Sequence, residues 1–259
     1  MKPSFFKFKF LIFIIFNSSF IISNSVIAQY TDNYAANFNG TNSYVAVPWH
    51  SELNPTIAIT VEAWVFPTAL PSPSGCIIGK NYLTSYYFGM ENTGRFIFFP
   101  RNQASGFLRS RVSGLVKVNQ WTHIAGTYDG TTTRLYINGI LDTSRTGITG
   151  NVGSNFDSLF IGCDRQSGLP AFFFNGRLDN VRIWKSARTA SELLNNMYIP
   201  LNIYQLSGTY SFIAASYQFD NSAVDNSGPA QNNGFGRISL TLIILTRLLI
   251  TWITIIVFF

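Results

Sequence analysis

The stretch WTHIAGTYDGTTTRLYING at residues 121–139 constrains the fold of this chain more than any other. Aromatic and β-branched residues fill its first half, and the same pattern resumes after Asp129-Gly130. An Asp-Gly pair readily takes positive φ, which favours a tight turn between two antiparallel strands. Alternation along the first run sends Trp121 and His123 to the same face. The stretch therefore predicts a β-hairpin within a sheet.

Strand patterns of this kind recur along most of the chain. The clearest is residues 57–66, where alternate apolar positions are separated by Thr60, Glu62 and Trp64. Turn residues separate it from further candidates at residues 34–38, 44–47, 76–79, 86–91, 95–99, 107–112, 159–163 and 178–184. One short helix is predicted to begin near Thr189, which can cap its first turn. Short strands with turn residues between them predict an all-β fold, an antiparallel β-sandwich.

The formal net charge of +6 raises the question of a nucleic-acid partner. Four of the 18 basic residues lie near the two ends of the chain, at Lys2, Lys7, Lys9 and Arg247. Residues 29–237 therefore hold 14 basic and 12 acidic residues, a net charge of +2. Such a scattered balance does not make a phosphate-binding patch, so no nucleic-acid partner is expected.

Residues 1–28 have the features of a secretory signal peptide. Basic residues precede an apolar stretch, and Val26-Ile27-Ala28 offers a cleavage motif before Gln29. An uncleaved membrane anchor is the alternative interpretation. Under either one, the bulk of the chain is exported, to the extracellular space or the cell surface.

Residues 238–259 form a hydrophobic tail, ISLTLIILTRLLITWITIIVFF, that is long enough to span a bilayer. Arg247 falls near its middle, where a charge is costly unless it is paired or reaches the interface. Membrane attachment through this tail, a buried tail and a disrupted C-terminus all remain open. The preceding residues 201–237 form a linker, the truncated start of a second unit, or an extra strand of the first domain.

Four stretches in order carry a family resemblance. Besides the hairpin they are FNGTNSYV, ITVEAWV and NGRLDNVRIW, at residues 38–45, 59–65 and 175–184. Together they resemble the concanavalin A-like, laminin-G-type (LamG or pentraxin-like) domains that are common in bacterial exported proteins. The resemblance implies a jelly-roll sandwich domain at residues 29–200. It implies much less about function, because one fold hosts many functions.

The resemblance also implies a structural calcium ion near the start of the domain. The matching positions are Gly40 and Asn42 in the first turn and Asp179 in the last strand pattern. Calcium prefers carboxylate and carbonyl oxygens, and the neutral Asn42 is a weaker ligand than a carboxylate would be. In the alternative interpretation, Asp179 caps backbone amides or pairs with Arg177 or Arg182.

Cys76 and Cys163 are the two cysteines of the chain. In an exported protein, two cysteines invite a disulfide. Two independently buried thiols are the alternative, because sequence does not show whether the Cα atoms come within bonding range. Neither cysteine has a histidine or a second cysteine at a metal-ligand spacing, so no zinc site is expected.

The sandwich fold also hosts glycoside hydrolases and polysaccharide lyases, so catalysis needs a direct test. A retaining glycosidase uses two carboxyl groups about 5 Å apart. No predicted strand carries two acidic residues on one face, and Glu62 is alone on its strand. Neither His50 nor His123 has a neighbouring nucleophile arranged as a dyad. We therefore expect no catalytic residues and no enzymatic activity.

Carbohydrate recognition combines an aromatic platform with convergent polar groups. Loop-like segments offer five aromatic candidates for such a platform, which are Trp49, Tyr82, Tyr87, Phe172 and Phe173. Residues 172–174 are all Phe and cannot all face one side of a strand, so at least one ring is exposed or covers a neighbouring edge. For each candidate, packing in the core is the alternative.

These observations predict an exported, bacterial, non-catalytic binding module. Its predicted partner is a carbohydrate or an extracellular or cell-surface protein, and glycan binding or cell-surface adhesion is the first hypothesis. The second is a structural protein–protein adhesion domain without a sugar site. The third is a glycoside hydrolase or polysaccharide lyase whose site is assembled from distant segments.

Overall fold

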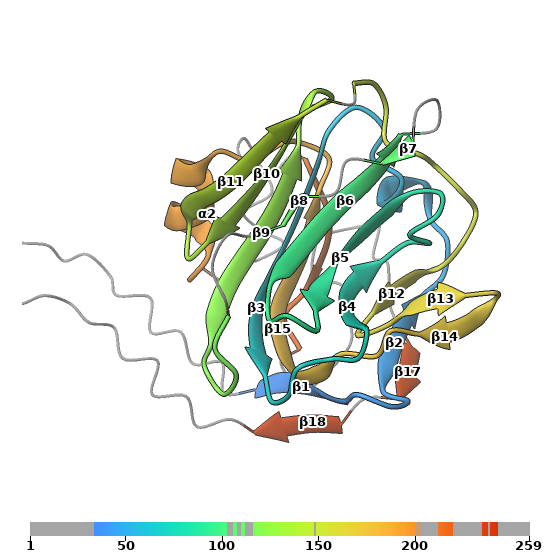
Figure 1. The fold of residues 1–259 in the computed structure, drawn as a ribbon, viewed down its shortest axis with the longest axis vertical. Coiled ribbons are helices and arrows are strands. Elements are labelled where there is room, and N and C mark those ends of the chain that lie inside the picture. The colour runs from blue at the N-terminus through green and yellow to red at the C-terminus, as the bar shows by residue number, and fades with distance from the viewer. Residues whose placement is uncertain are drawn as a thin grey trace, which may run out of the picture. The chain divides into compact units, whose positions relative to one another are not determined.

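The computed structural model describes most of the chain between Tyr34 and Leu242 (Figure 1). The described residues are 34–102, 106–107, 110–111, 116–147, 149–199, 201, 212–219, 235–237 and 239–242. The predicted signal peptide at residues 1–28 lies outside them, and so does the hydrophobic tail beyond residue 242.

Two antiparallel sheets make up the described part of the fold (Figure 1). The first has the strand order β11-β10-β9-β3-β15-β1-β18, and β16 also pairs with β15. Its strands are β1 (Tyr34–Asn39), β3 (Ile59–Pro67), β9 (Thr122–Tyr128), β10 (Thr132–Ile137), β11 (Ile140–Thr146), β15 (Asn175–Trp184), β16 (Ile213–Tyr217) and β18 (Ser239–Leu242).

The second sheet has the order β17-β2-β12-β4-β5-β6-β7, and β8 also pairs with β6. Its strands are β2 (Tyr44–Val47), β4 (Ser74–Gly79), β5 (Tyr86–Glu91), β6 (Phe96–Asn102), β7 (Gly106–Phe107), β8 (Ser110–Arg111), β12 (Leu159–Ile161) and β17 (Phe235–Arg237). A separate hairpin joins β13 (Asp164–Gln166) to β14 (Leu169–Ala171). The predicted antiparallel β-sandwich is confirmed.

The hydrophobic core lies between the two sheets and follows from alternation along each strand. On β5, Tyr86, Phe88 and Met90 belong to the core, whereas Tyr87 belongs to a separate cluster on the outer face. On β3, the alternate residues from Ile59 to Val65 face the core in the same way. Each large apolar side chain contributes about 1.5–3 kcal/mol when it is fully buried.

The hairpin predicted at residues 121–139 is confirmed as β9 and β10, with Tyr128 opposite Thr133. Asp129 holds its turn, because its Oδ1 accepts hydrogen bonds from the backbone N–H groups of Thr131 (2.9 Å) and Thr132 (2.8 Å). Asn138 and Gly139 both take positive φ and form the next turn, which leads into β11.

The predicted helix at Thr189 is also confirmed, as α2 (Ala190–Asn196). Thr189 accepts a hydrogen bond from the Glu192 backbone, and the Glu192 carboxylate accepts one from the Thr189 backbone. This reciprocal arrangement satisfies two backbone N–H groups at the start of the helix. Leu193 is buried against Ala125 of β9, so α2 lies on the outer face of the first sheet.

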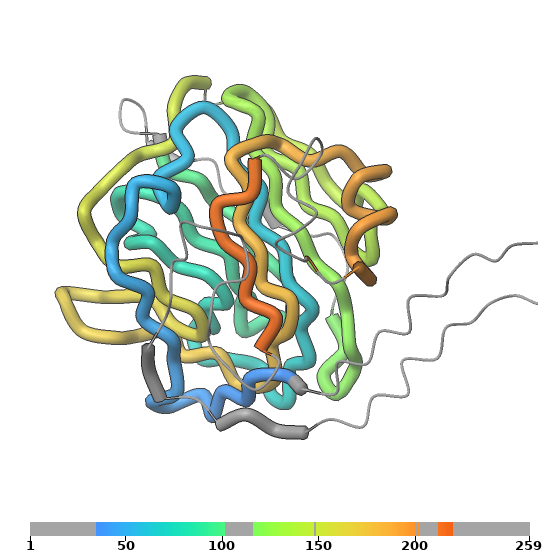
Figure 2. The backbone as a smooth tube through the Cα atoms, turned by 180° about the vertical axis from the view of Figure 1, so that it is seen from behind, coloured from blue at the N-terminus to red at the C-terminus, as the bar shows by residue number. Residues whose placement is uncertain are grey.

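The first sheet continues beyond residue 200, where the sequence places the end of the domain. Strand β16 pairs with β15 and lies beside it in Figure 2, and β18 pairs with β1. Residues 213–217 therefore form an extra strand of the same sandwich, which is one of the three interpretations of residues 201–237. Among the described residues, no helix has both the length and the apolar character needed to cross a bilayer.

Candidate functional site

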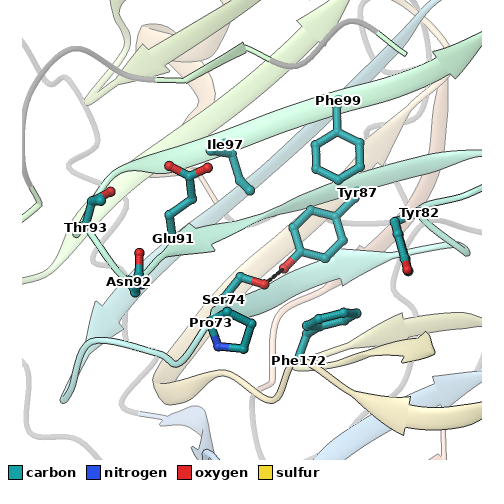
Figure 3. Close-up of a pocket in the computed structure, with 10 residues that line it drawn as sticks. All are labelled: Pro73, Ser74, Tyr82, Tyr87, Glu91, Asn92, Thr93, Ile97, Phe99 and Phe172. Atoms are coloured by element: carbon teal, nitrogen blue, oxygen red, sulfur yellow. Dashed lines mark hydrogen bonds between the residues drawn. The ribbon is translucent and has the colours of Figure 1, made fainter. Parts of the chain in front are cut away.

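An open groove of about 390 Å³ lies on the outer face of the second sheet (Figure 3). Strands β4, β5 and β6 contribute to it, together with the β4–β5 loop and the segment after β14. The described residues that line it are Pro73, Ser74, Tyr82, Tyr87, Glu91, Asn92, Thr93, Ile97, Phe99 and Phe172. The groove thus combines four aromatic rings with several polar side chains.

Tyr87 and Phe99 form the floor of the groove. They lie opposite each other on β5 and β6, and their rings stack with centroids 4.9 Å apart and an interplanar angle of 12°. Tyr87 is only 3% exposed, and its hydroxyl lies 3.3 Å from Ser74 Oγ as a hydrogen-bond donor. A Cβ atom added at Gly89 would meet the Tyr87 ring at 2.6 Å, so the ring can lie over the strand only because this position is glycine.

Tyr82 forms one wall of the groove, and its loop is fixed from beneath by Asp164. The backbone N–H groups of Asn81 (3.2 Å) and Tyr82 (2.9 Å) donate to the Asp164 carboxylate. Burial raises the pKa of Asp164 to about 6, against the lowering effect of these backbone hydrogen bonds. The Asp164 carboxylate therefore holds this turn by accepting both of its backbone N–H groups.

Lys80 anchors the same loop on its other side and is fully buried. Its Nζ donates to Asn155 Oδ1 (3.0 Å) and to the carbonyl oxygen of Asp157 (2.6 Å). Burial lowers the pKa of Lys80 to about 8, although the charge of Asp157 opposes this change. The loop that carries Tyr82 is therefore rigidly positioned rather than merely connecting two strands.

Phe172 forms the adjoining part of the wall, in an unusual backbone conformation. Its φ is +57°, which is rare for a bulky residue and costs on the order of 1–3 kcal/mol. The backbone is held there because the Cys76 N–H donates to the Phe172 carbonyl oxygen at 2.7 Å. The ring meets Tyr82 and Tyr87 edge-to-face, with centroid distances of 5.6 and 6.4 Å.

Polar side chains lie toward the other end of the groove, as Figure 3 shows. They are Glu91, Asn92 and Thr93, of which Asn92 and Thr93 are exposed in the β5–β6 turn, and Ser74 lies between them and the rings, beside the Tyr87 hydroxyl. Glu91 is the only carboxylate among the described residues that line the groove. These groups can donate or accept hydrogen bonds to a ligand that lies on the aromatic floor.

The structure brings together three of the five predicted platform aromatics, which are Tyr82, Tyr87 and Phe172. Phe173 instead packs against Tyr44 and Phe160 on the neighbouring part of the sheet. Trp49 lies apart from the groove lining and pairs with Phe156. Phe99 was missed. It follows Phe98 directly on the β6 strand pattern, so the two rings must lie on opposite faces of the sheet, and this was a usable signal.

His123 of the hairpin belongs to a different, closed cluster on the outer face of the first sheet. Glu62 lies opposite Arg182 in the sheet and is 1% exposed. Its Oε2 lies 3.1 Å from His123 Nε2, and its Oε1 accepts a hydrogen bond from Trp184 Nε1 at 2.8 Å. No acid lies beside His123 in the sequence, but the strand register brings Glu62 to it.

The charge of Glu62 is stabilised within this cluster. Burial alone raises its pKa, but the hydrogen bond from His123 and the positive charge of Arg182 outweigh burial and lower it to about 2. Arg182 also donates to the backbone carbonyl oxygens of Asn196 (3.0 Å) and Ile199 (2.5 Å). The cluster therefore fastens the α2 segment onto the sheet, and Glu62, His123 and Arg182 are each only 1% exposed.

A model of the Laminin_G_3 family, described as the concanavalin A-like lectin/glucanases superfamily, matches residues 39–194. The chain belongs to this family. The match covers both outer faces described above, including the groove and the Glu62 cluster. A comparison with curated proteins gave no match.

Solved structures share the fold of this Laminin_G_3 chain at low sequence identity. A putative carbohydrate-binding protein from Bacteroides ovatus has a TM-score of 0.64 and 22% identity, with 82% of this chain and 60% of that chain covered. The native heptameric SAP-like pentraxin of Limulus polyphemus has a TM-score of 0.55 and 13% identity, with 84% and 98% covered.

A third similar structure is domain 4 of AbnA, an extracellular GH43 arabinanase from Geobacillus stearothermophilus, in complex with arabinotriose. Its TM-score is 0.50 and its identity 22%, with 62% of this chain and 75% of that chain covered. The chain spans about 60% of the length of the Bacteroides ovatus protein. These similarities establish the fold.

The calcium ion implied by the family resemblance does not fit the predicted ligands. The Gly40 N–H donates to the carbonyl oxygen of Phe174, and Asp179 follows five residues later in the same direction. At about 3.3 Å per residue, the two positions are roughly 16 Å apart along β15. Calcium ligands all lie within 2.3–2.6 Å of the ion, so one ion cannot contact both.

Side chains already satisfy the polar groups at these predicted calcium positions. Asn39 Nδ2 donates to Asn42 Oδ1 at 2.8 Å, and Asn39 Oδ1 accepts from the backbone N–H groups of residues 41–43. Asp179 is buried and accepts from Asn180 Nδ2 at 3.1 Å. Within the described residues, no group of three or more His, Cys, Asp and Glu could hold a metal.

Cys76 and Cys163 are free, buried thiols, so the predicted disulfide is not formed and the second alternative holds. Cys76 packs beneath the groove with Tyr87 and Phe99, whereas Cys163 packs with Phe160. Burial, together with the nearby charge of Asp164, raises the pKa of both thiols. Their role is apolar packing, since a raised pKa keeps the unreactive thiol form.

Proposed function

We propose that this Laminin_G_3 chain is a non-catalytic carbohydrate-binding module that holds a glycan in the groove on its second sheet. The observation that carries the proposal is the composition of the groove, in which Tyr82, Tyr87, Phe99 and Phe172 meet a polar rim. Sugar rings have apolar C–H faces that pack on aromatic rings, and hydroxyl groups that hydrogen-bond to a rim of this kind.

The construction of the groove supports a binding role. Phe172 keeps a strained backbone although a glycine would adopt it freely, and the loop of Tyr82 is held by buried Asp164 and Lys80. Strain and buried anchors of this kind cluster where a ligand is positioned. Support also comes from two structures of the same fold, a putative carbohydrate-binding protein and an arabinanase domain in complex with arabinotriose.

The absence of catalysis forms part of the proposal. Glycoside hydrolysis uses two carboxyl groups that flank the bond to be broken. Among the described groove residues, Glu91 has no second carboxylate to work with. Glu62, the other acid considered, is enclosed beneath the α2 segment on the opposite side of the sandwich.

The predicted signal peptide at residues 1–28 places this binding at the cell surface or outside the cell. Membrane attachment through the tail at residues 238–259 is compatible with the same role, since the groove lies on the sandwich and not on the tail. Both segments remain sequence predictions.

A glycan array and calorimetric titration of the full chain test the proposal. We expect micromolar or weaker binding to a neutral glycan, and a loss of about tenfold in Tyr82→Ala and in Phe172→Ala, which corresponds to ~1.4 kcal/mol. The matched control is Phe212→Ala, which removes an exposed ring outside the groove lining and should change nothing. Thermal melting of each variant confirms that it is folded.

Failure to bind any glycan on the array, by a folded wild-type chain, would reject the proposal. Binding that survives both groove variants but is lost in Phe212→Ala would place the site elsewhere. Release of reducing sugar from a bound polysaccharide would overturn the non-catalytic part alone.

Protein–protein adhesion is the second candidate, and one observation favours it. Exposed apolar side chains gather where β11 meets α2, namely Ile140, Leu141 and Leu194. Surfaces of this kind mark interaction sites with proteins when the patch is large enough. A Leu141→Asp variant that loses adhesion to a surface coated with extracellular protein while keeping glycan binding would favour this candidate.

A further inference from the structure

A second pair of aromatic rings lies exposed near the groove. Trp49 follows β2 and Phe156 precedes β12, and their ring centroids are 5.2 Å apart. Phe156 is 85% exposed and Trp49 is 43% exposed. Single exposed apolar residues are ordinary, but two large rings in contact at the surface gain little from folding. The exposed rings of Trp49 and Phe156 are therefore a candidate contact for a ligand.

The chain fixes Phe156 in its exposed position. On one side, Asn155 is anchored to Lys80, whose Nζ donates to Asn155 Oδ1 and whose carbonyl oxygen accepts from Asn155 Nδ2. On the other side, the Asp157 carboxylate accepts a hydrogen bond from Asn81 Nδ2 at 2.8 Å. Phe156 lies in a bend between these two anchored neighbours, and its ring is left 85% exposed.

The same anchors connect this pair to the groove. Phe156 immediately precedes Asp157, and Tyr82, a wall of the groove, immediately follows Asn81. Phe156 and Tyr82 therefore lie on either side of the hydrogen bond between Asn81 and Asp157. The Cα atoms of Phe156 and Tyr82 are at most about 18 Å apart. The surface between them is polar, with half-exposed Asn81, Asp157 and Arg165.

The charges on this surface indicate the chemistry of its ligand. Arg165 Nη1 lies 3.5 Å from Asp157 Oδ1, so the two charged side chains balance each other. Between the two groups of rings, the described surface therefore offers no uncompensated cation to an acidic glycan. A neutral glycan fits this surface best.

We infer that Trp49 and Phe156 form a second contact for the ligand of the groove, so that the protein binds an extended neutral polysaccharide chain. The inference rests on the proposed function. Aromatic rings at both ends take the apolar faces of separated sugar units, and the polar strip between them takes hydroxyl groups. Once one end is bound, the second contact is intramolecular and raises the affinity without a second molecule.

Titration of the full chain with arabino-, xylo- and cello-oligosaccharides of two to six units tests the inference. We expect the affinity to rise about tenfold or more with length in the series that binds. The double variant Trp49→Ala/Phe156→Ala should lose about tenfold for the longest member and nothing for the shortest. Tyr82→Ala should lose affinity at every length. Leu169→Ala, which removes a similarly exposed apolar side chain, is the matched control.

The outcomes separate the inference from the proposed function. If Tyr82→Ala weakens binding and the double variant equals wild type at every length, the second contact is wrong and the groove binds a short ligand alone. If no oligosaccharide binds the wild-type chain, both are overturned. If wild type dimerises in sedimentation and the double variant does not, a second copy of the chain covers this pair, and the inference is wrong.

Discussion

The two outer faces of the sandwich carry similar side chains in opposite states. On the first sheet, Trp184 and Arg182 surround the carboxylate of Glu62 beneath the α2 segment. On the second sheet, the stacked rings of Tyr87 and Phe99 form the floor of an open groove. Each face places aromatic rings near a carboxylate, but one is closed by the chain itself and the other is accessible.

The difference shows that residue type does not decide between structure and binding in this fold. A buried carboxylate must be paired with donors, and Glu62 meets that demand with His123, Trp184 and Arg182. On the other face, the buried charged residues are Asp164 and Lys80, which hold the loop of Tyr82 from beneath. The half-exposed rings of Tyr82 and Phe172 remain available to a ligand, above the buried rings of Tyr87 and Phe99.

The largest effect is expected from Glu62→Gln, on the closed face. The change leaves Arg182 buried without its countercharge, and breaking such a pair costs about 3–5 kcal/mol of unfolding free energy. Urea unfolding measures it. Glu52→Gln, which breaks a half-exposed ion pair with Lys185, is the control and should cost less than about 1 kcal/mol. An unchanged midpoint with altered glycan processing would instead make Glu62 a functional residue.

The pH dependence of stability should report the same cluster. The pKa of Glu62 is lowered from 4.5 to about 2 in the folded chain, so its contribution is full above pH 4.5 and is lost as the pH falls toward 2. The lowering corresponds to about 3 kcal/mol. Between pH 6 and pH 2.5, the free energy of unfolding should therefore fall more steeply for wild type than for Glu62→Gln. Parallel profiles would contradict the assignment.

On the open face, Gly89→Ala should damage both stability and binding. The added Cβ would meet the Tyr87 ring at 2.6 Å and the Gly75 carbonyl oxygen at 2.5 Å. Overpacking of this kind costs about 1–3 kcal/mol, and displacement of the ring disturbs the floor of the groove. Denaturant unfolding and glycan titration measure the two effects. Full affinity in a folded Gly89→Ala chain would show that the floor does not contact the ligand.

The smallest effect is expected from Tyr82→Phe. The ring remains and the anchors of its backbone are unchanged, so the unfolding free energy should stay within about 0.5 kcal/mol of wild type. Glycan affinity should fall by less than about threefold if packing on the ring dominates. A loss as large as that of Tyr82→Ala would show that the Tyr82 hydroxyl, and not its ring face, makes the main contact.

Much of the fold was predictable because it depends on local patterns. Alternation marked β3, β9 and β10, turn residues separated them, and Thr189 marked the start of α2. The site was predictable only in part. Aromatic residues in loops marked Tyr82, Tyr87 and Phe172, but nothing local separates Phe172, in the groove, from Phe173, which packs on Tyr44.

The misses share one cause, which is strand register. Register places Glu62 beside Arg182 and His123 although the three are far apart in the chain, and it places Phe99 opposite Tyr87. The same register separates Gly40 from Asp179, which the resemblance had combined into one calcium site. A register is set by long-range packing, so it cannot be read from spacing along a single strand.

By itself, the sequence determined that this chain is an antiparallel sandwich of the laminin-G type, because alternation and turn chemistry act over a few residues. Only the tertiary structure decided which aromatic residues are covered and which are accessible. That choice depends on where α2 and the 80–84 loop lie over the sheets. Such packing is fixed by contacts between residues that are far apart in the sequence, such as Asp164 with Tyr82 and Arg182 with Asn196.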